Sequence, residues 1–478
     1  MKKSLNALDR SFLASERRDV MMHVGGLLVF SPTQHAQRDI SKRLREEIAR
    51  DNDKVQPPWN LRLNHPDLLA NPLQAWVEDD HFDLEYHIRR SALASPGDER
   101  ELGILVSRLH GAPLDFHRPP WEAHFIEGLE NDQIAIYFKV HHALIDGYTA
   151  IKILNRSFSK RPDDRDDTLF YARPPIEPKK REEREGPPVP TLAALLNAAR
   201  NQRSAAKDIG RAVVNMARAV RAHDKELVAP GQAPKSILNQ KITRSRRFAT
   251  QQVAIERLKN LGNKSGGTLN DVVLAICGSA LRRFLIEHDA LPNKPLVAMV
   301  PVNIRPKDDP GGSGNAVGAI LATLATDEPN AKKRLQAIIA STKRAKEQLS
   351  GMSRSAIMQY SALVIAPLMV SFVAPIAVGK TRPAFNVVIS NVPGPEEHLY
   401  LRGWRLDAAY PLSIPFHGYA LNITVHSYAG TLNFGFTGCR DTLPHLQRLA
   451  VYAGEAVDDL ERAFIPRERK SSARHLRA

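Results

Sequence analysis

Apolar side chains recur along this chain with two different periods, which predicts a mixture of strands and helices. The segment Gln133–Val140 (QIAIYFKV) alternates strictly, so that Ile134, Ile136, Phe138 and Val140 share one face of a predicted strand. Further strands are predicted at Val24–Phe30, Leu296–Val302, Phe385–Ser390, Ala420–Ser427 and Leu432–Thr437, and helices at Ile40–Ala49, Leu269–His288 and Lys332–Leu349. Their irregular alternation predicts a mixed α/β fold, with mixed sheets covered by helices in two domains of similar size.

The middle of the chain differs in composition from both ends. Charged residues and proline dominate Ser159–Pro190, which predicts a surface linker, and Val228–Pro234 predicts a second one. Between them, Leu192–Glu226 has the pattern of a basic amphipathic helix, either a crossover helix packed on a domain or a membrane-surface contact. We therefore predict an N-terminal domain over 1–158, a linker and basic helix over 159–240, a C-terminal domain over 241–466, and a basic disordered tail over 467–478.

The charge of the chain narrows the choice of partners. The 478 residues carry a formal net charge of +15, which attracts polyanions such as nucleic acid, an anionic membrane surface or the phosphates of a coenzyme. Neither zinc-finger spacing nor an aromatic RNA-binding signature is present, so no nucleic-acid partner is expected. The two cysteines lie far apart, the metal-binding pattern CxxC is missing, and the basic N-terminus has no apolar core after it. A cytoplasmic protein without a disulfide or a signal peptide is expected.

One apolar run tests that expectation. No charged residue occurs between Arg354 and Lys380, and Ala362–Val378 is almost wholly apolar, close to the length of a membrane span. Pro367 and Pro375 interrupt the run, which favours a buried or membrane-dipping helix pair over a true span. Together with the basic helix, this run predicts peripheral association with a membrane or with lipid inclusions.

The segment His141–Gly147 (HHALIDG) directly follows the alternating strand, where a strand gives way to a loop and catalytic groups are common. Alternation places His142 on the inward face with Phe138 and Val140, where a neutral imidazole is able to accept a proton. Asp146 would orient that ring or anchor the turn through an arginine, and Gly147 permits a close backbone approach. The alternatives are a structural core histidine or a metal site, but neighbouring histidines point apart and no third ligand is nearby, so no metal is expected.

The motif HHxxxDG resembles the signature of the coenzyme-A-dependent acyltransferase superfamily, which includes chloramphenicol acetyltransferases and peptide-synthetase condensation domains. Other segments resemble the bacterial wax ester synthase/diacylglycerol acyltransferase family in particular, with Pro120 standing where that family usually has leucine. These segments are Leu8–Glu16 (LDRSFLASE), Met22–Leu27 (MHVGGL), Pro113–Asp115 (PLD), Arg118–Glu122 (RPPWE), Asn270–Asp271, Val302–Arg305 (VNIR) and Ser390–Pro395 (SNVPGP). The resemblance runs from about Leu8 to Ile465.

This resemblance implies two domains of the chloramphenicol-acetyltransferase type with a channel between them, joined by a long crossover linker. It implies that His142 deprotonates the hydroxyl of a fatty alcohol or diacylglycerol, which then attacks the thioester of acyl-CoA without an acyl-enzyme. His141 and Asp146 would mainly shape the site. Acyl-CoA would be a substrate, and no cofactor is expected.

The resemblance also suggests further site residues. Asn270 is a candidate oxyanion donor, although Thr268–Asp271 equally predicts a helix start capped by Thr268. Asp271, Ser390, Asn391, Gly394 and Gly147 are predicted to contact substrate, and for SNVPGP a plain loop is the alternative. Arg305 and Arg382 are candidates to pair with Asp146 or with CoA phosphates.

Two other functions compete with this hypothesis. A condensation-type enzyme acting on carrier-bound thioesters would share HHxxxDG, but no carrier-protein motif adjoins it. A non-catalytic lipid-body protein would retain the fold without needing His142.

Overall fold

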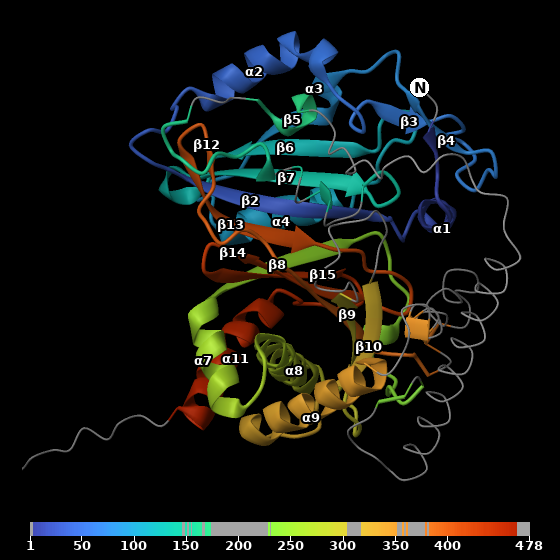
Figure 1. The fold of residues 1–478 in the computed structure, drawn as a ribbon, viewed down its shortest axis with the longest axis vertical. Helices are drawn as coiled ribbons and strands as arrows, with labels where there is room; N and C mark the ends of the chain where they lie inside the picture. Colours follow the sequence, from blue (N-terminus) through green and yellow to red (C-terminus); the bar gives the residue numbers. More distant parts are fainter. Residues whose placement is uncertain are drawn as a thin grey trace, which may run out of the picture.

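The computed structural model describes residues 3–145, 149–150, 153, 155–164, 168–173, 228–229, 231–303, 317–350, 356–357, 360–361, 378–379 and 382–465. Within these residues the chain forms two six-stranded mixed sheets and one small three-stranded sheet. The two large sheets lie in an upper and a lower domain in the view of Figure 1. The predicted mixed α/β fold with two sheet-and-helix domains is confirmed.

The upper sheet is built mainly from the N-terminal part of the chain. Its order is β12 (Tyr400–Leu401), β13 (Trp404–Leu412), β2 (His23–Pro32), β7 (Ile134–His141), β6 (Trp121–Glu127) and β5 (Ile88–Ala92). One face packs under α2 (Ile40–Arg50) and the short α3 (Leu84–His87), and the other face under α4 (Glu99–His110). The small sheet orders β1 (Lys3–Ser4), β4 (Ala75–Glu78) and β3 (Leu61–Leu63), and α1 (Ala7–Ser15) packs beside it.

Four helices of the described chain pack on one face of the lower sheet, while α4 of the upper domain contacts β8 (Arg246–Ala254) from the other face. The order of the lower sheet is β10 (Val317–Thr323), β9 (Val297–Asn303), β11 (Val387–Val392), β14 (Leu421–Tyr428), β15 (Thr431–Cys439) and β8. Its helices are α7 (Ile255–Ser265), α8 (Leu269–Glu287), α9 (Ala331–Ser350) and α11 (Arg448–Phe464), which Figure 1 shows below the sheet. The 3₁₀ turns are Asn52–Lys54, Glu130–Asp132, Phe170–Ala172 and Ile237–Asn239.

Helix α8 is the centre of the lower domain. Its side chains from Asp271 to Leu281 are buried all around, because α7, α9 and α11 surround it beside the sheet. Its apolar pattern is therefore that of a core helix and not of an amphipathic surface helix. In the part of the chain that the structure describes, no helix is both long and apolar enough to cross a membrane.

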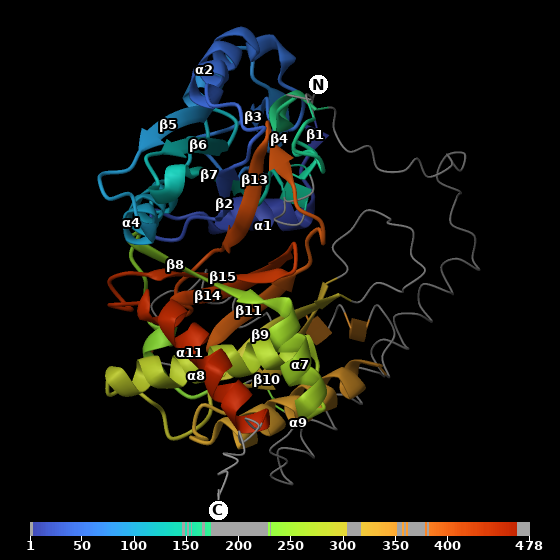
Figure 2. The same cartoon turned by 90° about the vertical axis from the view of Figure 1, so that its left-hand side faces the viewer.

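The C-terminal half contributes two strands to the N-terminal sheet. Strand β13 pairs antiparallel with β2 from Trp404↔Pro32 to Leu412↔Gly25, and Figure 2 shows it in orange inside the upper domain. The predicted C-terminal domain over 241–466 therefore contains a segment that completes its neighbour. Dividing the chain into consecutive domains misses this exchange, because strand pairing between distant segments leaves no local sequence pattern.

The predicted linkers are partly core. Phe170 and Tyr171 are buried in the upper domain, so the surface prediction is wrong for this end of Ser159–Pro190. In Val228–Pro234, Val228 and Ala233 are buried in the lower domain while Gly231 and Gln232 are exposed, so this segment is partly core as well. The basic helix Leu192–Glu226, almost all of Ala362–Val378 and the tail over 467–478 lie outside the described residues.

Candidate active site

A cavity of about 350 Å³ lies between the two large sheets. Its upper wall is one face of β2 and β7, and its lower wall is the face of β9, β11 and β14 opposite to α8 and α9. The upper lining includes Val24, Gly26, Leu28, Phe138, Val140 and His142, and the lower lining includes Met299, Val388, Ser390, Val392, Asn422, Thr424 and His426. None of the described lining residues carries an ionised side chain except where a histidine is protonated. The cavity therefore suits an apolar substrate with a few polar contacts.

His142 lines this cavity on the same face as Phe138 and Val140, as the alternation of the strand predicts. Its backbone N–H donates to the carbonyl of Met22 at 2.8 Å, which ties the loop to the start of β2. The ring of Phe12, from α1, stacks on its imidazole with centroids 4.1 Å apart and planes 24° apart. His142 is therefore held at the cavity surface and is not sealed in a core.

His141 faces the opposite way and is buried, with 1% of its surface exposed. Its Nδ1 accepts the backbone N–H of Ala143 at 3.1 Å, so in the neutral ring Nε2 carries the proton. That Nε2 lies 3.5 Å from Oε2 of Glu16, which also accepts the Met22 N–H at 2.6 Å. His141 does not line the cavity, and its ring contacts lie within and beside the loop that carries His142.

Glu16 and Phe12 are two residues of this site to which sequence reasoning assigned no role. Both lie in LDRSFLASE, which was noted only as a family-like opening. Helix α1 brings them to His141 and His142 because its apolar side packs on the small sheet with Leu13. A local pattern predicts that helix, but not which strand end it meets.

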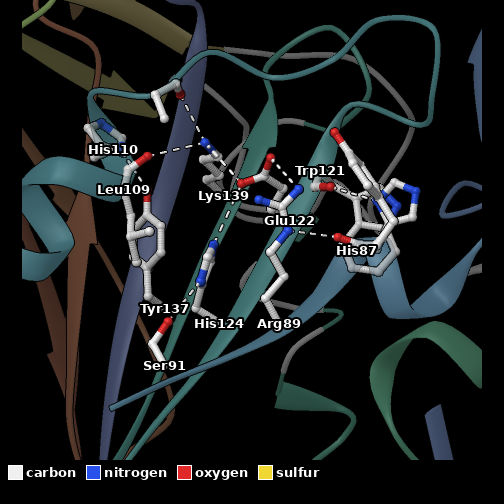
Figure 3. A network of polar contacts seen from close by, with 12 residues as sticks. His87, Arg89, Ser91, Leu109, His110, Trp121, Glu122, His124, Tyr137 and Lys139 are labelled. Carbon is white, nitrogen blue, oxygen red and sulfur yellow. Dashed lines mark hydrogen bonds and ion pairs between the residues drawn. The ribbon is translucent and has the colours of Figure 1, made fainter. Parts of the chain in front are cut away.

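The face of β7 that points away from the cavity carries a buried polar network (Figure 3). Lys139 is fully buried, and its Nζ donates to the carbonyls of Leu109 and Ala112 and lies 3.2 Å from Oε2 of Glu122. Glu122 and Lys139 are directly opposite each other in the β6–β7 register. The ion pair joins β6 to β7, and the two hydrogen bonds to backbone carbonyls anchor the end of α4 to the strand that leads to His142.

Asp146 and Gly147 lie outside the described residues, as does Arg305. Their predicted roles stay predictions. Within the described ranges, no group of three or more histidine, cysteine, aspartate or glutamate side chains is arranged to hold a metal ion.

Asn270 and Asp271 lie at the start of α8 and do not line the cavity. Oδ2 of Asp271 accepts from the N–H and the hydroxyl of Thr268, and Oδ1 accepts from the Thr342 hydroxyl at 2.6 Å. The carboxylate thus forms a capping box and joins α8 to α9. This geometry supports the structural alternative for the pair and gives no support to a substrate contact by Asp271.

The segment SNVPGP reaches the cavity with some of its residues. Ser390 and Val392 line the cavity, whereas Asn391 alternates to the other side of β11. Gly394 lies so close to β14 that a Cβ there would meet the Ser427 carbonyl oxygen at 2.2 Å and the His426 ring at 2.4 Å. Glycine is therefore required for this loop to pack against His426, and Gly394 acts by allowing that approach.

His426 is a second cavity imidazole that sequence reasoning missed. Its Nδ1 lies 3.1 Å from the carbonyl oxygen of Val392, to which it donates in the neutral form. Burial lowers the pKa of His426 to about 4, although this hydrogen bond raises it. His426 is neutral at pH 7 and a much weaker base than an ordinary histidine. The alternation of the predicted strand Ala420–Ser427 was the sequence pattern from which the side that His426 faces could have been inferred.

The sequence profile of the wax ester synthase/diacylglycerol acyltransferase catalytic domain matches residues 5–273, and that of the WS/DGAT C-terminal domain matches residues 313–461. The chain belongs to the wax ester synthase/diacylglycerol acyltransferase family. A putative diacylglycerol O-acyltransferase of Mycobacterium tuberculosis is 49% identical over 488 residues, which cover 96% of this chain and 97% of the relative. The family resemblance of the sequence is confirmed.

Solved structures agree with this family assignment. The wax ester synthase/diacylglycerol acyltransferase from Marinobacter aquaeolei VT8 matches with a TM-score of 0.72 and 37% identity, over 96% of this chain and 99% of that one. A starter condensation domain of rhizomide synthetase matches with a TM-score of 0.53 and 14% identity, over 96% and 94% of the two chains, which shows a shared fold alone. This WS/DGAT family member is an O-acyltransferase whose cavity lies between two domains of the expected type.

Proposed function

We propose that this chain transfers a long-chain fatty acyl group from acyl-CoA to a fatty alcohol, a diacylglycerol or both, with His142 as the general base. The observation that carries the proposal is the place of His142, at a strand end on the wall of an apolar cavity between the two domains. The names of the relatives support the substrate class, since they include a diacylglycerol O-acyltransferase and a wax ester synthase.

In the proposed reaction, the imidazole of His142 takes the proton of the acceptor hydroxyl as its oxygen attacks the thioester carbonyl. A C–O bond forms, and the carbonyl electron pair moves to oxygen in a tetrahedral intermediate. Collapse of this intermediate breaks the C–S bond, and the imidazolium returns its proton to the leaving thiolate. A positioned general base of this kind contributes about 10²–10⁴-fold to the rate.

The low pKa of His426 supports His142 as the base of the two cavity histidines. A group with a pKa of about 4 has too low an affinity for a proton to remove one from a hydroxyl efficiently near pH 7. His141 is turned away from the cavity and engaged by Ala143 and Glu16. In this proposal His141 holds the loop that carries His142, and Ser390 contacts substrate. Asp146 orients the site and Gly147 and Asn391 lie near substrate, as the sequence suggests.

The test is release of CoA thiol from palmitoyl-CoA with hexadecanol or a dioleoylglycerol as acceptor. We expect the wild type to consume free palmitoyl-CoA, and His142→Ala to lose about 10²-fold or more of kcat while its circular dichroism is unchanged. His81→Ala is the matched control, because His81 is exposed and does not line the cavity. Equal rates for wild type and His142→Ala refute the mechanism, and activity only with carrier-bound thioesters favours a condensation-type enzyme.

We also propose peripheral attachment to a membrane or to lipid inclusions. The net charge of +15 and the apolar run Ala362–Val378 motivate this proposal. High-salt or carbonate washing of membranes is expected to release the protein. Retention after both treatments refutes a peripheral association.

A further inference from the structure

The lower wall of the cavity carries an ordered row of polar side chains on β14. Asn422, Thr424 and His426 face the cavity, while the alternate residues Ile423 and Val425 are buried on the helix-covered side. Parallel pairing sets Thr424 beside Ser390 of β11. The wall opposite His142 therefore offers hydrogen-bonding groups on a rigid sheet and not on a loop.

Ser413, which follows β13, forms a chain of hydrogen bonds with Thr424 and Asn422 of β14. The Thr424 hydroxyl donates to Oδ1 of Asn422 at 3.0 Å, and the Ser413 hydroxyl lies 2.6 Å from Oγ1 of Thr424. A threonine hydroxyl has one proton, so when Thr424 donates to Asn422, Ser413 donates to Thr424. Because Oδ1 accepts this bond, the amide is oriented and its Nδ2 is the donor left for other partners.

Nδ2 of Asn422 has no hydrogen-bond acceptor among the residues that the structure describes. Asn422 is also only partly buried and lines the cavity, so its two N–H groups are accessible from there. Asn155 lines the cavity too, but within the described chain no hydrogen bond orients its amide. The alternative that sequence suggested, Asn270, lies outside the cavity lining.

We propose that Nδ2 of Asn422 donates a hydrogen bond to the thioester carbonyl oxygen and stabilises the oxyanion of the tetrahedral intermediate. Thr424 and Ser413 are positioning residues that orient its amide. This assignment rests on the proposed function, and it gives the acyl transfer the electrophilic group that His142 does not supply. The base stands on the upper wall and the donor on the lower wall, so the reacting carbonyl lies between them.

Neutral donors matter here because no described lining residue offers a permanent positive charge. In a water-poor cavity, one preorganised amide aimed at developing charge is worth about 10²–10³-fold in kcat. The gain arises mainly in the transition state, since the negative charge on the carbonyl oxygen is small in the ground state.

The experiment measures thiol release from palmitoyl-CoA with hexadecanol for Asn422→Ala and Asn422→Asp. Both variants are expected to lose about 10²-fold or more of kcat, with KM changed less than about threefold. Thr424→Val, which removes the hydroxyl that donates to Asn422, is expected to lose about tenfold, and Thr424→Ser, which retains it, is expected to keep most activity. Binding of hexadecyl-CoA, a thioether without a carbonyl, should be equal in wild type and Asn422→Ala.

The outcomes separate this assignment from the proposed function. If the wild type is active and both Asn422 variants keep its kcat, the oxyanion role is overturned while the proposed function stands. Loss of kcat together with a matching loss of hexadecyl-CoA binding also overturns it, because Asn422 would then act through packing. A wild type that transfers no acyl group from palmitoyl-CoA refutes the proposed function and this assignment with it.

Discussion

The ring of Phe12 lies almost parallel to the imidazole of His142, with centroids 4.1 Å apart. The contact joins α1 to the strand end of β7, so a helix near the N-terminus restrains the orientation of the proposed base. Stacking of this kind limits rotation of the ring out of its reactive position.

We expect Phe12→Leu to lower kcat about tenfold with little change in KM, because a small misplacement of a catalytic group is costly. Phe12→Tyr keeps the planar ring and serves as the matched control. Steady-state thiol release measures both parameters. A Phe12→Leu variant with the kcat of the wild type would show that other contacts hold the imidazole.

Leu28 lines the cavity that contains His142 and also a second, almost wholly apolar cavity of about 50 Å³ in the upper domain. If the acyl tail extends along this face, Leu28→Trp blocks the way and shifts preference toward shorter chains. We expect the ratio of kcat/KM for palmitoyl-CoA over octanoyl-CoA to fall at least about tenfold, since each buried CH₂ contributes about 0.8 kcal/mol.

The matched control for Leu28→Trp is Leu28→Met, which nearly conserves volume. An unchanged ratio for palmitoyl-CoA over octanoyl-CoA excludes the acyl tail from this cavity. A shift confined to the chain length of the alcohol would instead assign the cavity to the acceptor.

The buried pair of Lys139 and Glu122 gives a stability prediction. Burial raises the pKa of Glu122, but the neighbouring His124, with Nε2 3.6 Å away, and the charges of Lys139 and Arg89 outweigh it and bring the pKa to about 2. Lys139→Met removes the Lys139 cation from the buried Glu122, which keeps Arg89 at 3.4 Å, and leaves two backbone carbonyls without the Lys139 donor. We expect the free energy of unfolding, measured with urea, to fall by about 3–5 kcal/mol.

The control for this pair is the double variant Glu122→Gln/Lys139→Met. The double variant removes both charges. Its loss of unfolding free energy should therefore be clearly smaller than the sum of the losses measured for Glu122→Gln alone and Lys139→Met alone. Additive losses would mean that the two groups do not interact energetically.

His110 predicts a dependence of stability on pH. Burial lowers its pKa to about 3, with Arg246 adding to the effect, while its hydrogen bond to the Ser413 carbonyl acts the other way. The folded protein therefore favours the neutral ring. The stability that it contributes is complete above about pH 6.5, the ordinary histidine value, and is lost as the pH falls toward 3.

We expect the free energy of unfolding of the wild type to decrease from pH 6.5 to pH 5, where the carboxylates stay ionised. His110→Gln should remove about 1.4 kcal/mol per pH unit from this slope. Urea titrations at three pH values in this window measure it. A slope that is the same in His110→Gln and wild type would show that other groups cause the acid sensitivity.

Several elements could be predicted from sequence because their patterns are local. The alternation of Gln133–Val140 predicted β7 and the face on which His142 lies, and the helical period of Leu269–His288 predicted α8. Thr268 predicted the start of α8 and its N-cap, since a cap and its first turn are close in sequence. The family followed from motifs spread over the whole chain.

Other features needed the folded chain. The pairing of β13 with β2, the stacking of Phe12 on His142 and the row of Asn422 and His426 opposite it join segments far apart in sequence. Alternation shows that a residue faces one side of its strand, but not what covers that side, so the deep burial of Lys139 was not predictable. Sequence alone determined the family, several strands and helices, and the side of β7 on which His142 lies. Only the tertiary structure decided which residues meet across the cavity, because that depends on packing between distant elements.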